Sequence, residues 1–202
     1  MCSSDLSTFR FIASGRAEGI SSYIISMAKD PSDVLAVILL LRKCGLERRL
    51  PIVPLFETLE DLDNAAWTLE RLLHLNWYNE YIEGHQQIMI GYSDSAKDAG
   101  QMAAAWAQYR AQEDLVTVSE KYGVKLTLFH GRGGTVSRGG APARDAIRSQ
   151  PPGSVGGSMR VTEQGETIRF KYGSTPLALD SLDLVVSRSE EHTSELQSPD
   201  HL

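Results

Sequence analysis

The sequence predicts an α/β fold in which βα units surround a parallel sheet. Short apolar runs alternate with longer segments whose apolar residues recur at helical spacing, and glycine or proline separates them. Polar residues follow three of the expected strands, at Glu57, Asp94 and His130. The carboxyl ends of parallel strands form the ligand site both in a (β/α) barrel and in a doubly wound sheet, so these observations leave both architectures open.

The first βα unit is expected to begin with a strand at residues 20–27. Asp30 and Pro31 then supply an N-cap and a first-turn proline for a helix through residues 34–43, which Gly45 ends. The apolar content of this helix predicts that it is buried.

The second unit is expected to begin with a strand at residues 50–56, and Thr58 can cap the helix that follows. Trp77, Tyr78 and Tyr81 are expected to be packing residues. The apolar stripe of the capped helix is predicted to be core, and consists of Leu59, Leu62, Ala66, Leu69, Leu72 and Leu73.

The third and fourth units are expected to begin with strands at residues 87–91 and 125–129. A long helix is predicted over residues 99–121, with Met102, Trp106, Leu115 and Val118 as its apolar side. Residues 139–157 are rich in glycine, proline and serine, which predicts a loop or lid. Two short segments after it, 160–161 and 167–172, are predicted to be extended.

The stretch with the strongest functional signal is residues 126–140, LTLFHGRGGTVSRGG, which concentrates histidine, arginine and glycine. His130 is expected where a strand opens into a loop, and Arg132 and Arg138 add charge and forked donors that suit phosphate or carboxylate oxygens. The glycines allow positive φ angles, and their amides can line an anion site. They are Gly131, Gly133, Gly134, Gly139 and Gly140. The combination indicates a proton shuttle beside an anion site.

Three other interpretations of this stretch were weighed. A single histidine near a strand end is more often structural than functional. Arginine and glycine also alternate in nucleic-acid-binding tails, but such tails are basic and of low complexity, whereas this chain has a net charge of −6 and a pI near 5.4. No GxxxxGK[ST] phosphate loop is present in the sequence. We therefore expect no nucleic-acid partner.

The chain resembles the phosphoenolpyruvate carboxylase family. The resemblance is carried by FHGRGGTVSRGGAPARDAIRSQPPGS (129–154) and RVTEQGETIRFKYG (160–173), preceded in the family's order by YIISMAKDPSDVLAV (23–37), PLFETLEDL (54–62) and GYSDSAKDAG (91–100). The resemblance implies a partial (β/α)8 TIM-type barrel of about four βα units, with a glycine-rich loop and short extended segments, because a complete barrel needs about 250 residues.

Glu57 and Asp94 are candidate metal ligands. Carboxylates that converge at neighbouring strand ends suit a hard cation such as Mg²⁺ or Mn²⁺, although two acids alone could equally be loop or cap residues. The resemblance implies that they are the family's metal-binding acids, in its LFET and GYSD motifs.

The resemblance also implies catalytic roles for Lys97, His130, Arg132 and Arg138, and substrate binding by Arg132, Arg138, Gly133 and Gly134. Ser137 departs from the family, which usually has glycine before the second arginine. If that position needs a positive φ, serine costs about 1 kcal/mol there.

The implied reaction is that of a carbon dioxide-fixing lyase. Phosphoenolpyruvate and bicarbonate would give oxaloacetate, which feeds the tricarboxylic acid cycle, and phosphate. The resemblance implies a homotetramer for the full-length enzyme. No secretory segment or membrane-spanning run is found in the sequence, so we expect a cytoplasmic protein without a membrane partner.

The two ends of the chain, residues 1–6 and 188–202, do not resemble the family. The codons GTG TGC TCT TCC GAT CT encode the first stretch, and their reverse complement encodes the RSEEHT that begins the second. We expect both ends to be translated sequencing adapter, which leaves residues 7–187 as the partial catalytic barrel. Cys44 is the single cysteine of that part, so no disulfide is expected within it.

Three alternatives to the carboxylase remain at this point. One is another metal-dependent barrel enzyme acting on phosphoenolpyruvate or pyruvate, and the others are non-catalytic: an anion-binding remnant or an RGG-type module. The family's second catalytic histidine, in a TAHPT-type motif, does not occur in this sequence. We therefore predict that the chain expressed alone is inactive and poorly folded, with open sheet edges and unburied helix faces.

Overall fold

A parallel five-stranded sheet forms the centre of the fold. The computed structural model describes residues 3–15, 19–92, 100–131, 149–155, 159–162 and 165–183. The strands are β1 (Tyr23–Ile25), β2 (Ile52–Phe56), β3 (His85–Gly91), β4 (Lys125–Gly131) and β5 (Arg160–Val161). The helices are α1 (Ser3–Ala13), α2 (Pro31–Lys43), α3 (Leu59–Leu73), α4 (Asn76–Ile82), α6 (Gln101–Lys121) and α8 (Gly165–Tyr172), and residues 175–183 are also helical.

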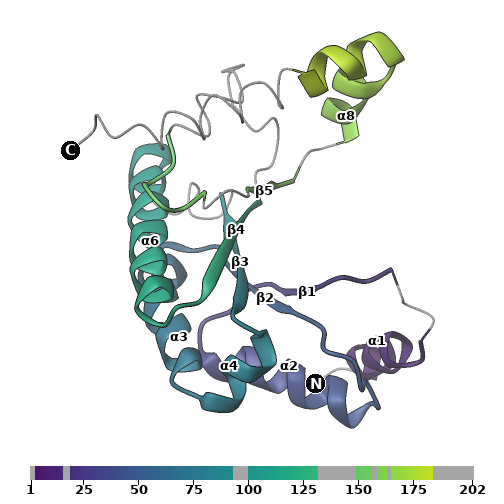
Figure 1. Cartoon of the computed structure of the whole chain (residues 1–202), viewed down its shortest axis with the longest axis vertical. Helices are drawn as coiled ribbons and strands as arrows, with labels where there is room; N and C mark the ends of the chain where they lie inside the picture. Colours follow the sequence, from purple (N-terminus) through teal and green to yellow (C-terminus); the bar gives the residue numbers. More distant parts are fainter. Residues whose placement is uncertain are drawn as a thin grey trace.

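Each strand lies beside the one that precedes it in the chain, in the order β1-β2-β3-β4-β5. Parallel crossovers are almost always right-handed, so an order without reversal places the crossover helices on one side of the sheet. Figure 1 shows α2, α3 and α6 on the same side. A doubly wound sheet would reverse its strand order and carry helices on both faces. The predicted α/β fold is therefore confirmed, and the strand order favours the barrel over the doubly wound alternative.

Local capping signals set where the first two crossover helices begin. Asp30 is the N-cap of α2 and Pro31 its first residue, as predicted. Asp33 Oδ2 accepts hydrogen bonds from the backbone amides of Lys29 and Asp30, at 2.9 and 3.1 Å. Thr58 is the N-cap of α3, also as predicted. Such caps satisfy backbone donors that a helix cannot pair internally.

The core lies between the sheet and its helices. All five residues of β2 are buried, because this strand has neighbours on both edges and is covered by helices. The predicted stripe of α3 is mostly confirmed, since Leu59 and Ala66 are half-buried and the rest are buried. The largest fully buried side chains include Phe56, Leu62, Leu69, Leu72, Leu73, Ile88, Ile90, Leu115 and Leu128.

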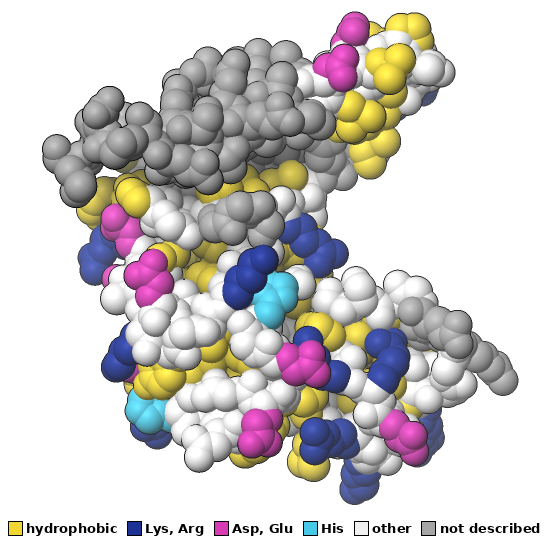
Figure 2. All heavy atoms as spheres, viewed as in Figure 1, with side chains coloured by type: hydrophobic (Ala, Val, Ile, Leu, Met, Phe, Trp, Pro, Cys, Tyr) yellow, Lys and Arg dark blue, Asp and Glu magenta, His cyan; other side chains and the backbone are white. Residues whose placement is uncertain are grey.

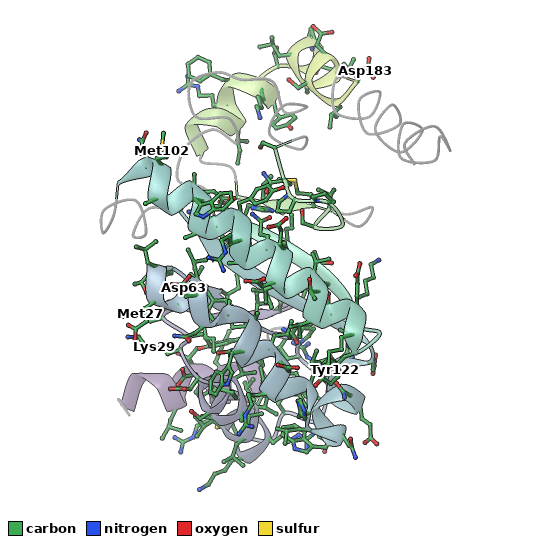
Figure 3. The ribbon with its side chains drawn as sticks, turned by 90° about the vertical axis from the view of Figure 1, so that its left-hand side faces the viewer. Met27, Lys29, Asp63, Met102, Tyr122 and Asp183 are labelled. Carbon is green, nitrogen blue, oxygen red and sulfur yellow. The ribbon has the colours of Figure 1, made fainter. Side chains whose placement is uncertain are left out.

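The prediction for the apolar side of α6 was partly wrong. Leu115 is buried and Val118 half-buried, but Met102 and Trp106 are 88% and 62% exposed. Figure 3 shows Met102 at the outer end of this helix. The buried side carries smaller and polar residues, because α6 packs closely against α3 and β4. They are Ala104, Gln108, Ala111, Gln112, Leu115 and Ser119.

Three further predictions differ, in whole or in part, from the structure. The aromatic cluster after α3 forms helix α4, in which Tyr78 is buried and Tyr81 half-buried but Trp77 is 42% exposed. Residues 167–172 were predicted to be extended and instead belong to α8. A helix pairs its own backbone groups, whereas a strand needs a partner edge, and the neighbouring β5 has only two residues. The first strand is shorter than predicted, three residues in place of eight.

Large apolar side chains lie exposed on α8 and on the helix that follows it, where Figure 2 shows a hydrophobic surface at the upper right. Phe170 is 81% exposed and Leu179 58%. Within the described residues, β1 and β5 each pair on one edge only. Open edges and unburied helix faces were predicted for this chain, and the described residues show both.

The described part of the chain contains no helix that is both long and apolar enough to cross a membrane.

Candidate active site

The site lies at the carboxyl ends of β2, β3 and β4. The register pairs Phe56 with Ile90 and Ile90 with His130, and it pairs Gly91 with Gly131. Because the three strands are parallel and in register, the residues at their ends meet at one edge of the sheet. Glu57, Tyr92 and His130 are therefore brought to the same edge, although they are far apart in the sequence.

Glu57 is held by the capping box of α3. Its backbone amide and that of Thr58 both donate to Asp61 Oδ2, at 3.3 and 3.1 Å, and the Asp61 amide donates to Thr58 Oγ1 at 3.1 Å. Asp61 is only 2% exposed, and its Oδ1 atom has no hydrogen-bond partner among the residues that the structure describes. The sequence TLED thus caps a helix and also fixes the turn that carries the half-buried Glu57.

Gly91 ends β3 at a point where a side chain would press tightly against the neighbouring strand. A Cβ atom there would lie 3.1 Å from Glu57 Cα and Cγ and 3.3 Å from the Phe56 carbonyl oxygen. On the helix side, Gln108 of α6 is 6% exposed, and its Nε2 donates to the Gly91 carbonyl at 3.1 Å. The end of β3 is therefore fixed on both sides.

His130 is buried, with 1% of its surface exposed. The Tyr92 hydroxyl lies 2.7 Å from His130 Nδ1, and the two ring centroids are 6.0 Å apart. The backbone amide of Thr162, just after β5, donates to the His130 carbonyl at 3.1 Å. Both the ring and the backbone of this histidine are thus held by neighbouring strand ends.

Gly131 has a different role from the one that its sequence pattern predicted. It was grouped with glycines that provide positive φ, but it lies in β4 and is not among the described glycines with positive φ. A Cβ atom there would lie 2.5 Å from Met89 Cε and 3.3 Å from the Ile90 carbonyl oxygen. Glycine here lets the Met89 side chain of β3 pack closely against β4, and a Cβ atom would have to displace the flexible end of that side chain.

A family model described as "Phosphoenolpyruvate carboxylase" matches residues 2–200 of the chain. The chain belongs to this family. It is 66% identical to the phosphoenolpyruvate carboxylase of Hahella chejuensis over 179 residues, which are 89% of this chain and 20% of that protein. It is 61% identical over 188 residues to the enzyme of Shewanella sediminis, and 56% over 186 residues to that of Acinetobacter baumannii. These matches cover 93% and 92% of this chain, and 21% of each relative.

The chain spans about one fifth of the length of the curated carboxylases that it matches. Residues 3–6 lie in α1, and residues 188–202 lie outside the described residues. The expected adapter origin of the two ends stays a prediction.

Of the predicted site residues, the structure describes Glu57 and His130. Both lie at the carboxyl ends of the strands. Asp94 and Lys97 lie outside the described residues, within 93–99, which directly follow Tyr92. The other predicted positions fall within 132–148, which directly follow Gly131 and also lie outside the described residues. They are Arg132, Gly133, Gly134, Ser137 and Arg138.

A carboxylate donor at this edge fits a hard divalent cation, since Mg²⁺ and Mn²⁺ prefer oxygen ligands. Glu57 supplies such an oxygen donor on a turn that Asp61 holds rigid. Within the described ranges, no group of three or more His, Cys, Asp and Glu side chains could hold a metal ion.

Sequence reasoning missed three residues that shape the site: Asp61, Tyr92 and Gln108. The Thr58-to-Asp61 spacing is a readable capping signal for the first. Tyr92 directly follows the strand expected at 87–91, and Gln108 lies within the helix expected at 99–121. The contacts of both depend on a neighbouring element, so no local pattern identifies them.

Proposed function

We propose that this chain is part of the catalytic (β/α)8 barrel of a phosphoenolpyruvate carboxylase, which converts phosphoenolpyruvate and bicarbonate to oxaloacetate and phosphate. The observation that carries the proposal is the meeting of Glu57 and His130 at the carboxyl edge of a parallel sheet, in a chain 66% identical to a named carboxylase. The parent protein would be a cytoplasmic homotetramer, and the chain alone would be inactive.

Mg²⁺ or Mn²⁺, held by Glu57 and Asp94, would supply positive charge to the phosphoryl and enolate oxygens. Arg132, Arg138 and Lys97 would bind the phosphate as it is transferred, and the amides of Gly133 and Gly134 would add donors to it. A bicarbonate oxygen attacks phosphorus, and the bond from phosphorus to the enol oxygen breaks. The products of this step are carboxyphosphate and the enolate of pyruvate.

His130 would act in the second step as a general base. It takes the proton of carboxyphosphate, which then breaks into carbon dioxide and phosphate, and the proton passes on to phosphate. The enolate carbon attacks carbon dioxide to give oxaloacetate. The burial of His130 supports this role, because water at the enolate would protonate it to pyruvate instead.

The test uses a full-length protein, because this chain covers about one fifth of its relatives. The matched segment of the Hahella chejuensis enzyme is replaced by residues 7–187 of this chain, which gives an exchange enzyme. We expect oxaloacetate formation that requires Mg²⁺ or Mn²⁺ and bicarbonate, measured by coupling to malate dehydrogenase. The unmodified relative serves as the reference.

His130→Asn is expected to lower the rate of oxaloacetate formation by about 100-fold or more, the scale of general base catalysis. His74→Asn is the matched control, because His74 is exposed at the end of α3 and hydrogen-bonds Tyr122 rather than the site. A folded tetrameric exchange enzyme that forms no oxaloacetate would contradict the proposal for this segment. If Ser137→Gly then restored turnover, the fault would lie at that position alone.

A further inference from the structure

The tyrosine that follows β3 contacts the proposed base directly. The Tyr92 hydroxyl lies 2.7 Å from Nδ1 of His130, which is a short hydrogen bond between a phenol and an imidazole. None of the roles given above for the active-site residues involves Tyr92. Its position next to a buried histidine raises the question of what the bond does to that histidine.

The backbone of each partner is fixed independently of the bond. Gln108 holds the carbonyl of Gly91, the residue before Tyr92, and Gly91 packs tightly against Glu57. Thr162 holds the carbonyl of His130. The ladder pairs Gly91 with Gly131 directly beside the contact. The two side chains therefore meet at a point that four sheet elements define, which makes the contact a built feature of the site.

The bond decides which nitrogen of His130 can act as the base. Nδ1 is engaged by Tyr92, so a substrate proton has to reach Nε2. Nε2 can accept a proton only if the neutral ring carries its hydrogen on Nδ1. That tautomer donates Nδ1–H to the phenol oxygen. When Nε2 takes the proton, Nδ1–H continues to donate, so the same hydrogen bond serves both charge states of the ring.

We propose that Tyr92 is the positioning residue for His130: its hydroxyl accepts the Nδ1 hydrogen and so keeps Nε2 available for the proton of carboxyphosphate. This inference rests on the proposed function. It assigns Tyr92 no contact with the substrate. Formation of the enolate and carboxyphosphate does not need this base, so losing the hydroxyl affects the second step and leaves the first.

The test is Tyr92→Phe in the exchange enzyme, because phenylalanine keeps the ring and removes only the hydroxyl. We expect the kcat for oxaloacetate to fall by about tenfold to 100-fold, the usual range when the partner that orients a functional histidine is removed. The KM for phosphoenolpyruvate should change by less than about threefold, since uniform binding is retained. The ratio of phosphate released to oxaloacetate formed should rise above one, because the first step continues: water then hydrolyses the carboxyphosphate to bicarbonate and phosphate, and the enolate takes a proton to give pyruvate.

Tyr78→Phe is the matched control. It also removes a buried hydroxyl from a hydrogen bond, here with Gln86 near the opposite end of β3, and it does not touch His130. This variant should keep the product ratio at one. A ratio that rose equally in both variants would show a general structural effect and overturn the inference.

A double-mutant cycle gives the second readout. If Tyr92 acts through His130, Tyr92→Phe has no further effect in the His130→Asn background. Additive losses would overturn the inference and leave the proposed function intact. The inference would also be overturned, and the proposed function left intact, by a third result. In it, the exchange enzyme is active and its His130→Asn variant is inactive, but its Tyr92→Phe variant keeps both the rate and the product ratio. A folded exchange enzyme without oxaloacetate formation would remove the proposed function and, with it, this inference.

Discussion

Hydrogen bonds of buried polar side chains occur at both ends of the parallel sheet, but they act on different parts of the molecule. At the amino ends of β2 and β3, the Tyr78 hydroxyl donates to Gln86 Oε1 at 2.8 Å, and Gln86 Nε2 donates to the Ile52 carbonyl at 3.1 Å. These bonds join buried polar groups to the backbone. At the carboxyl ends, the bonds of Asp61, Tyr92 and Gln108 instead fix the side chains and turns that carry Glu57 and His130.

The difference teaches that similar hydrogen bonds serve stability at one end of the sheet and orientation at the other. A change at the amino end should lower stability and leave the chemistry intact. A change at the carboxyl end should lower activity more than stability. The following substitutions in the exchange enzyme separate the two, in order of decreasing effect.

Glu57→Gln should have the largest effect. It keeps the size of the side chain and removes the charge that the cation needs. We therefore expect kcat/KM to fall by about 100-fold or more, and the Mg²⁺ concentration needed for half-maximal activity to rise. Activity is measured across a Mg²⁺ titration. Glu60→Gln, on the exposed first turn of α3, is the control and should be neutral. Equal losses in both variants would mean that Glu57 has no special role.

Tyr78→Phe should destabilise the protein by about 1–3 kcal/mol, because it leaves a buried Gln86 oxygen without its donor. Burial raises the pKa of the Tyr78 phenol, so the hydroxyl stays protonated and able to donate. The measurement is the midpoint of thermal inactivation, together with kcat at a temperature well below it. A large loss of kcat without a shift in the midpoint would contradict the claim that contacts at the amino end serve stability and not the chemistry.

Thr58→Ala tests whether one residue can serve both purposes. Loss of the cap should cost about 1 kcal/mol. The same change loosens the turn of Glu57, so the Mg²⁺ concentration needed for half-maximal activity should also rise. Thr117→Ala is the control, because Thr117 bonds its own helix on the exposed side of α6. An unchanged Mg²⁺ requirement would limit the capping box to stability.

His85 should give the smallest effect, as a weak pH dependence of stability at the amino end. Partial burial, followed by the charges of Lys125 and Arg49, lowers the pKa of His85 below its usual 6.5. The folded state therefore binds the proton less well than the unfolded state, so this contribution to stability is present above pH 6.5 and is lost as the pH falls below it.

His85→Gln can keep the hydrogen bond to Thr127 but does not titrate. The stability of wild type relative to the variant should fall as the pH is lowered from 7.5 to 5.5, measured by thermal midpoints at each pH. A wild type that gains stability relative to the variant in this interval would contradict the direction of the shift.

Local sequence signals predicted the elements well where each signal acts within a few residues. Asp30 and Thr58 identified the helix starts, and the apolar runs placed four of the strands. Residues 167–172 were predicted to be extended, but the structure has a helix there. A segment of six residues is too short for its sequence to separate a strand from a helix, and the result depends on whether a sheet edge is available.

The candidate site divides in the same way. Glu57 and His130 could be found from the sequence, because an acid and a histidine directly follow apolar runs, and the family motifs carry them. The exposure of Met102 and the reason for Gly131 could not be found, since they depend on the rotation of α6 and on the distance to Met89. The same holds for Tyr92 as the partner of His130.

The sequence by itself therefore determined the family, the α/β pattern and the residue types that carry the chemistry, because motifs, caps and periodicities are local. Only the tertiary structure decided that the strands run in sequential order, and that Tyr92 at the end of β3 reaches His130 on the neighbouring strand β4. Sheet register places residues 38 positions apart within hydrogen-bond distance, and no pattern along the chain encodes that meeting.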